Sequence, residues 1–325
     1  MISIMTLFMN NFIHLWIMME INTLMLISLM ALKSKSFKAT FNFFVIQSIS
    51  SLMLIVLFIV MNNFYSYSMF NFIMAMTFML KLGMFPFFFW PPLINKNIDW
   101  ILIFIMSTSQ KLIPLLMINQ YISLINNKLF FYLILWSILI SSLISTMMNY
   151  NELNLKKILT FSSLNHLSWM ILILMFDSSM FLTYFLIYSI SMIFLCIILN
   201  KFDINSLNDF LKIQFFDSKK INFIITFNFL IISALPPFLT FLIKMNSIKI
   251  LMENYSFSSS LFFLMISIFT LIFYMNIIIK MNMFIMIKMK FFNQFYSNLK
   301  LNFFTSIFIS FLSSTFLFFL FNSIY

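Results

Sequence analysis

The chain has 325 residues, of which 63% are hydrophobic and only 8% are charged, and its formal net charge is +11. A soluble globular domain carries about 25% charged residues, so this composition excludes a water-soluble protein. It predicts an all-α polytopic membrane protein with a single membrane domain over residues 1–325. A transmembrane β-barrel would need short alternating segments and frequent turns, and the sequence shows neither.

The rare residue types exclude most cofactor sites. One cysteine, Cys196, excludes disulfides and cysteine-ligated zinc or iron–sulfur centres. A single glycine excludes the glycine-rich loops that bind nucleotides, and two histidines cannot form a three-histidine metal site. We therefore expect this chain to bind no metal and no redox cofactor.

Apolar runs of about 20 residues, the length needed to cross a bilayer, recur along the chain. Residues 1–9 precede them as an apolar stub that is too short to cross alone. The runs predict about ten spans, near 11–32, 40–61, 68–90, 99–125, 129–149, 157–176, 180–200, 221–249, 258–280 and 301–322.

The lysines between these spans fall mainly on one side of the predicted membrane domain. With alternating loops, only Lys128 and Lys249 lie on the other side. The lysine-rich side carries Lys33, Lys35, Lys38, Lys96, Lys156, Lys157, Lys201, Lys212, Lys219, Lys220, Lys280, Lys288, Lys290 and Lys300. Because basic loops face the matrix or cytoplasm, the positive net charge indicates orientation, and we expect no nucleic-acid partner.

Four charged residues lie inside predicted spans: Glu20, Lys81, Lys111 and Lys244. A charged side chain at the centre of a membrane helix costs about 2.5–3.5 kcal/mol, whereas a leucine returns only about 0.3–0.6 kcal/mol. Charges retained at this cost are typical of proton relays. Two simpler interpretations stay open. The lysines, Lys244 above all, can reach the membrane interface, or Glu20 and Lys81 form an ion pair that only fixes packing.

The stretch KLGMFPFFFWPP, residues 81–92, places the only glycine and three of the six prolines directly after an intramembrane lysine. All six prolines lie in or beside the three spans that hold intramembrane lysines. Proline removes a backbone donor and kinks a helix, and broken helices near a buried charge are typical of ion-transport paths. We predict helix breaks at Gly83, Pro86, Pro114, Pro236 and Pro237.

The stretch LKKILTFSSLNHLSWM, residues 155–170, carries several serines, Asn165 and His166 into a span. Serine and asparagine side chains often hydrogen-bond helices to one another, so packing alone would explain them. A histidine side chain also changes protonation near neutral pH, which suits His166 to proton transfer. Both interpretations of His166 stay open, and we include it among the candidate relay residues.

Five stretches of the chain resemble the family of mitochondrial NADH dehydrogenase subunit 2, an antiporter-like membrane subunit of respiratory complex I, and they occur in the same order as in that family. They extend over residues 18–245, and the C-terminal third is similar only in hydropathy. Phe88 stands where the family usually has histidine, and Ser233 and Thr240 where it usually has glycine. The stretches are MMEINTLMLISL (18–29), MLKLGMFPFFFWPP (79–92), SQKLIPLLMI (109–118), LKKILTFSSLNHLSWM (155–170) and ALPPFLTFLIKM (234–245).

The resemblance implies an antiporter-like fold with two proline-broken helices, and proton translocation coupled to NADH oxidation and ubiquinone reduction. By motif, Glu20 pairs with Lys81, and Lys111 and Lys244 continue a hydrated axis. The NADH, FMN, iron–sulfur and ubiquinone sites of this proton-translocating NADH:ubiquinone reductase then lie in other subunits. The implied location is the mitochondrial inner membrane, with lysine-rich loops in the matrix. The implied partners are other membrane-arm subunits and the lipid bilayer, cardiolipin included.

Two other functions are compatible with the residues alone. A stand-alone cation/proton antiporter would share the broken helices and the buried charges, and it would work without partners. A structural membrane spacer would explain the apolar spans, but it leaves the cost of four buried charges without a reason. The matching stretches favour the complex I subunit over both.

Overall fold

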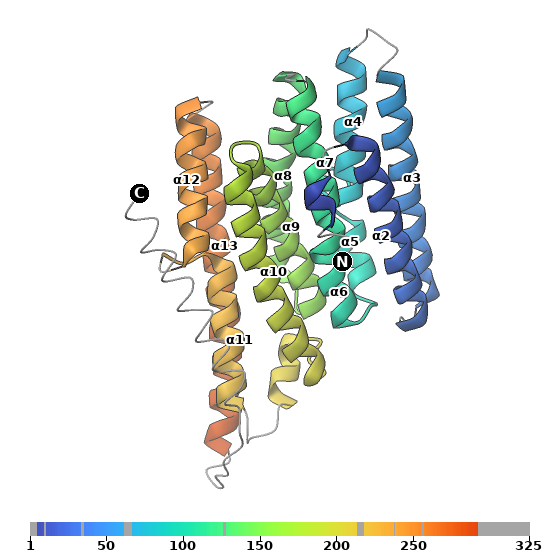
Figure 1. The fold of residues 1–325 in the computed structure, drawn as a ribbon. Coiled ribbons are helices and arrows are strands. Elements are labelled where there is room, and N and C mark those ends of the chain that lie inside the picture. Colours follow the sequence, from blue (N-terminus) through green and yellow to red (C-terminus); the bar gives the residue numbers. More distant parts are fainter. Residues whose placement is uncertain are drawn as a thin grey trace. The chain divides into compact units, whose positions relative to one another are not determined.

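A computed structural model describes residues 5–9, 11–33, 36–61, 67–125, 128–212, 218–236, 238–254 and 257–291. All regular elements in these ranges are helices (Figure 1). The predicted span 301–322 and the predicted break at Pro237 lie outside the described residues. The helices are η1 Thr6–Phe8, α2 Phe12–Lys33, α3 Phe37–Met61, α4 Tyr67–Leu82, α5 Trp90–Asn95, α6 Trp100–Ser107, α7 Ser109–Ile125, α8 Lys128–Asn151, α9 Leu155–Leu174, α10 Ser178–Lys201, η2 Leu207–Lys212, α11 Ser218–Ser233, α12 Leu239–Asn254 and α13 Phe257–Phe291.

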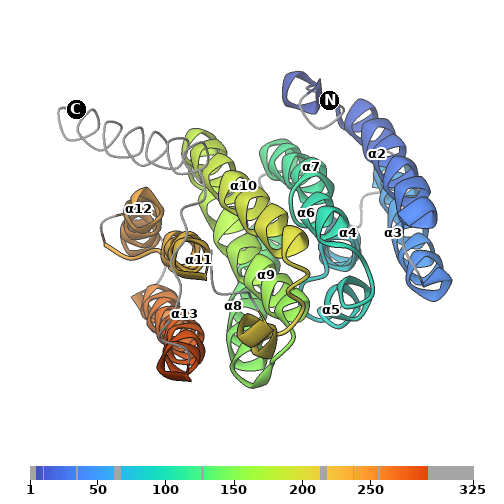
Figure 2. The same cartoon turned by 90° about the horizontal axis from the view of Figure 1, so that it is seen from below.

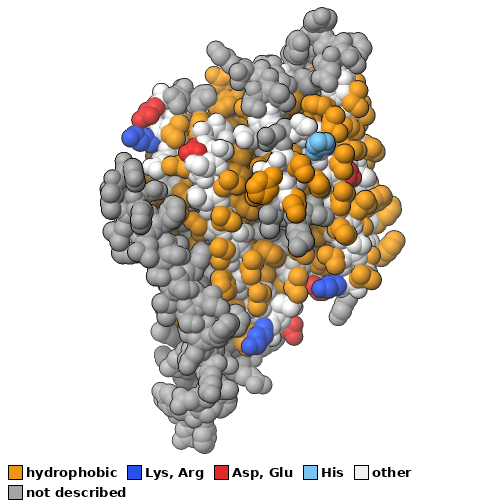
Figure 3. Space-filling view, in the orientation of Figure 1, with side chains coloured by type: hydrophobic (Ala, Val, Ile, Leu, Met, Phe, Trp, Pro, Cys, Tyr) orange, Lys and Arg blue, Asp and Glu red, His pale blue; other side chains and the backbone are white. Residues whose placement is uncertain are grey.

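The described helices suit a bilayer in length and surface. Seven of those found in the described ranges are long and apolar enough to cross a membrane. Hydrophobic side chains cover most of the visible described surface, and most charged side chains lie toward its ends (Figure 3). The all-α polytopic class is therefore confirmed, while the number of about ten spans and the single domain stay predictions.

The first of two compact units ends at Phe185 and contains α2 to α9 with the start of α10. Its centre is α9, in which 94% of the apolar window is buried, against 28% in α2 and 33% in α3. α8 packs along α9, α4 packs along α3, and α7 lies between α2 and α9 (Figure 2). Side chains of α9 therefore meet those of α7 in the interior.

Polar side chains fix the contact between α2 and α7. The Asn22 amide donates to the backbone oxygen of Ser109 at 3.2 Å, and the Gln110 amide donates back to the oxygen of Asn22 at 3.0 Å. Each bond satisfies an amide that would otherwise be costly inside a membrane. These two hydrogen bonds hold the start of α7 against α2, directly before Lys111.

The chain breaks after α4 where glycine and proline predict it. Gly83 has φ +69°, a left-handed conformation that glycine adopts without strain. The Trp90 indole then donates to the oxygen of Leu80 at 3.0 Å and satisfies a carbonyl at the end of α4. Pro91 and Pro92 stand in the first turn of α5, where a missing N–H costs nothing.

The interruption near Lys111 lies at Thr108, and α7 continues through Pro114. The side chains of Ser107 and Thr108 both donate to the oxygen of Phe104, at 3.0 and 2.8 Å. Such hydroxyl bonds to the preceding turn bend helices. Hydroxyl groups, rather than the predicted proline, therefore mark where α6 ends and α7 begins.

The second compact unit begins at Leu186, within α10. In it α11 and α12 both lie along the long helix α13 (Figure 1). The break between them contains Ala234, whose φ is +59°, and Pro236. Across it, the Thr240 hydroxyl donates to the oxygen of Ile231 at 3.1 Å, so this side chain satisfies a carbonyl in the last turn of α11.

We expect Gly83→Ala to lower the thermal unfolding temperature of the purified chain. A left-handed alanine costs roughly 1 kcal/mol or more, and its Cβ would overlap the ring of Pro91. Tryptophan fluorescence during heating in detergent measures the change. Ala234→Gly is the matched opposite case and should raise the unfolding temperature, because it relieves a left-handed alanine. Unchanged unfolding of Gly83→Ala would contradict the described turn.

Candidate functional site

Lys111 reaches from α7 to the middle of α9. Its side chain is buried, and its Nζ donates to both the backbone oxygen and the Oγ of Ser163, each at 2.9 Å. The Ser163 hydroxyl in turn donates to the oxygen of Thr160 at 2.7 Å. Ser163 thus offers Lys111 two oxygens as acceptors, and it stabilises an ammonium group without a carboxylate.

Lys81 and Glu20 approach each other without a direct hydrogen bond. The Lys81 Nζ lies 4.0 Å from Glu20 Oε1, with 2% of the lysine and 28% of the glutamate side chain exposed. Neither of these atoms has a hydrogen-bond partner among the described residues. Gln47 of α3 donates to the backbone oxygen of Lys81 at 3.3 Å. The geometry is that of a loose ion pair.

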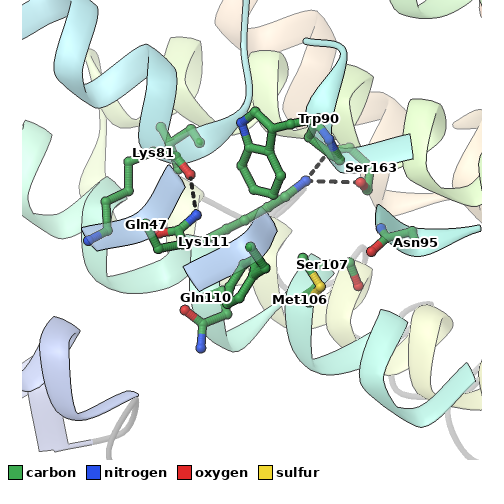
Figure 4. Close-up of a pocket in the computed structure, with 12 residues that line it drawn as sticks. Gln47, Lys81, Trp90, Asn95, Met106, Ser107, Gln110, Lys111 and Ser163 are labelled. Atoms are coloured by element: carbon green, nitrogen blue, oxygen red, sulfur yellow. Dashed lines mark hydrogen bonds between the residues drawn. The ribbon is translucent and has the colours of Figure 1, made fainter. Parts of the chain in front are cut away.

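A small cavity of about 20 Å³ lies beside both lysines, with room for about one water molecule. Its lining comes from α3, α4, α5, α6, α7 and α9. Figure 4 shows the Lys111 side chain extending to Ser163, while the Lys81 side chain points away from it. The polar lining residues are Gln47, Lys81, Asn95, Ser107, Gln110, Lys111 and Ser163.

The other two predicted relay residues lie elsewhere. His166 is buried on α9, with its Nδ1 2.8 Å from the Tyr184 hydroxyl of α10, and it does not line the cavity. Lys244 is buried on α12 of the second unit. Around one cavity the structure brings together Lys81, paired with Glu20, and Lys111.

Three residues that contact this site had weak signals in the sequence. Ser163 belongs to the polar stretch that we interpreted as packing or relay, and its role as the acceptor for Lys111 depends on helix contacts. Gln47 and Asn95 are isolated amides in or beside apolar segments. Only the tertiary structure shows that they line the cavity. Among the described residues, no group of three or more His, Cys, Asp or Glu side chains could hold a metal ion.

Residues 9–270 match the family described as NADH:quinone oxidoreductase/Mrp antiporter, TM. The chain belongs to this family. This family membership confirms the resemblance that the sequence motifs predicted. The chain is a membrane subunit of the complex I and Mrp antiporter type.

Relatives of the chain are named NADH-ubiquinone oxidoreductase chain 2. The protein of Anopheles gambiae is 32% identical, over 85% of this chain and 81% of the mosquito protein. That of Apis mellifera ligustica is 32% identical, over 83% of this chain and 79% of its own length. That of Didelphis virginiana is 30% identical, over 84% and 80%.

Solved structures at 14% identity share the fold of this family. A chain of respiratory complex I from Thermus thermophilus with bound aureothin has a TM-score of 0.71 and matches 84% of this chain and 66% of its own length. A chain of the archaeal membrane-bound sulfane sulfur reductase has a TM-score of 0.67, over 82% and 61%. A chain of the Mrp complex from Dietzia has a TM-score of 0.61, over 74% and 49%.

We expect Ser163→Ala to destabilise the chain by about 1–3 kcal/mol, because it removes a hydrogen bond to a charged group. Ser168→Ala is the control, since the Ser168 hydroxyl is equally buried and donates to the Asn165 oxygen on its own helix at 2.6 Å. Thermal unfolding in detergent compares them. Equal losses in the two variants would contradict the bond between Lys111 and the Ser163 hydroxyl.

Proposed function

We propose that the chain is a proton-translocating core subunit of respiratory complex I in the mitochondrial inner membrane. It couples NADH:ubiquinone electron transfer in other subunits to proton movement along Glu20, Lys81, Lys111 and Lys244. The relatives named NADH-ubiquinone oxidoreductase chain 2 support the complex. The arrangement of buried charges supports the proton movement.

The observation that carries this proposal is the environment of Lys111. Its ammonium group is bonded to neutral oxygens of Ser163, and no described carboxylate lies within ion-pair distance of it. Deprotonation of Lys111 therefore breaks no ion pair among the described residues. Deprotonation of Lys81 would instead leave Glu20 unpaired. We assign proton exchange to Lys111 and the tuning of charge to the Glu20–Lys81 pair.

Lys81 and Lys111 both contribute to the lining of one cavity, and we expect the charge on one lysine to affect the other. Two like charges in a low dielectric repel strongly, so a change in the Glu20–Lys81 distance alters the energy of a proton on Lys111. Moving one charge against 100 mV costs about 2.3 kcal/mol. A modest rearrangement of an ion pair in a membrane is therefore sufficient to drive a proton on or off Lys111.

The complex I assignment also implies where the cofactors bind, how the chain is oriented and which partners surround it. NADH, FMN, iron–sulfur clusters and ubiquinone bind elsewhere in the complex. The lysine-rich loops face the matrix, in keeping with the distribution of basic residues in the sequence. Other membrane-arm subunits and lipids, with cardiolipin among them, surround the helices. His166, hydrogen-bonded to Tyr184, is a further relay candidate.

We expect the chain to migrate with the large NADH-oxidising band when source membranes are mildly solubilised and separated on a native gel. An activity stain locates the band, and peptide mass spectrometry locates the chain. Migration alone at low mass would overturn the complex I assignment. It would favour a cation/proton antiporter, in line with the fold shared with a chain of the Mrp complex, and ion flux in liposomes would then test that function.

We expect Lys111→Met to lower proton pumping by the assembled complex at least about tenfold, because a relay step contributes about 10²–10⁴-fold. The purified complex in liposomes, with a pH-sensitive dye and NADH, gives the rate. Lys201→Met removes an exposed lysine at the end of α10 and should leave pumping unchanged. Wild-type pumping by Lys111→Met would overturn the proton role.

A further inference from the structure

Asn95 is the one unsatisfied asparagine beside the two lysines. Its side-chain oxygen is buried and has no hydrogen-bond partner among the described residues, and the residue is 4% exposed. Asn71, Asn149, Asn165 and Asn228 also have an unsatisfied side-chain atom. Only Asn95 lines the cavity that Lys81 and Lys111 share (Figure 4). An unsatisfied buried acceptor is unfavourable, and Asn95 lines a space that admits about one water.

Asn95 also stands next to the surface. It is the last residue of α5, and the following residues, Lys96 and Asn97, are exposed. Lys156, at the start of α9, donates to the backbone oxygen of Ile98 at 2.8 Å and holds the connection between α5 and α6 against α9. The residue that lines the cavity is thus followed directly by exposed residues of the predicted lysine-rich side.

Lys111 has a donor left for this cavity. An ammonium group has three hydrogens, and the two oxygens of Ser163 account for two of them. The third hydrogen of the ammonium group remains for a group in the cavity that Lys111 lines. A water there would accept from the ammonium of Lys111 and donate to the Oδ1 of Asn95. Residue 95 must then supply an oxygen that accepts a hydrogen bond from this water, and the size of its side chain matters less.

We propose that Asn95 is a positioning residue that holds a water for proton exchange between Lys111 and the lysine-rich side. This inference rests on the proposed proton translocation. In the step, an N–H bond of the Lys111 ammonium breaks and an O–H bond forms on the water. The lysine is left as a neutral amine, and the hydronium ion passes its extra proton to water at the surface beside Lys96. The reverse transfer restores the ammonium.

Two isosteric substitutions test the acceptor separately from the shape. Asn95→Thr keeps a hydroxyl oxygen and should retain at least about half of wild-type pumping. Asn95→Val replaces that oxygen with a methyl group and should lower pumping at least about tenfold. Asn149→Val is the control, because Asn149 is equally buried and unsatisfied but does not line the cavity; it should pump normally. Equal pumping by the Thr and Val variants would overturn the proposal.

A measurement on the unmodified complex does not depend on whether the variants assemble. A density map that resolves waters should show one bonded to both Asn95 Oδ1 and Lys111 Nζ. A protein group bonded to Asn95 Oδ1 in its place would overturn the proposal. Lys111→Met separates the two levels of inference. If it pumps normally, the proposed function fails; if it does not pump while Asn95→Val does, only the role of Asn95 fails.

Discussion

An ammonium group inside a bilayer needs acceptors that the chain itself supplies, and the arrangement around Lys111 depends on this constraint. Ser163 supplies two oxygens, and it can do so only from a helix in the interior of the first unit. α9 is such a helix, since it is buried along almost its whole length. The bonds between Asn22 and the start of α7 then fix the position of Lys111 opposite Ser163.

The sequence alone predicts the features whose physics is local. Charges in apolar spans are conspicuous because they are expensive, so Glu20, Lys81 and Lys111 could be selected without a structure. Gly83 also predicts its own turn, because a left-handed conformation suits glycine best. The family membership could be predicted because residues of these two kinds fall in short stretches at particular places in the chain.

Features that depend on contacts between distant segments could not be predicted. Pro114 suggested a break, yet α7 continues through Pro114 and the interruption lies at Thr108, where the Ser107 and Thr108 hydroxyls share the Phe104 carbonyl. Asn95 is one of many asparagines, and neither Asn95 nor Gln47 belongs to a motif that would single it out. Their relation to the lysines comes from the packing of α3, α5 and α9 around a cavity, which no periodicity in the sequence expresses.

The hydroxyl groups of α9 determine the sign of the charge that this interior can hold. Thr160, Ser162, Ser163 and Ser168 each donate their hydrogen to the carbonyl three residues earlier. Each oxygen then has only lone pairs to offer to other groups. At these four positions α9 presents oxygen acceptors, which stabilise a cation. An excess proton that crosses this interior therefore meets acceptors along these turns of α9.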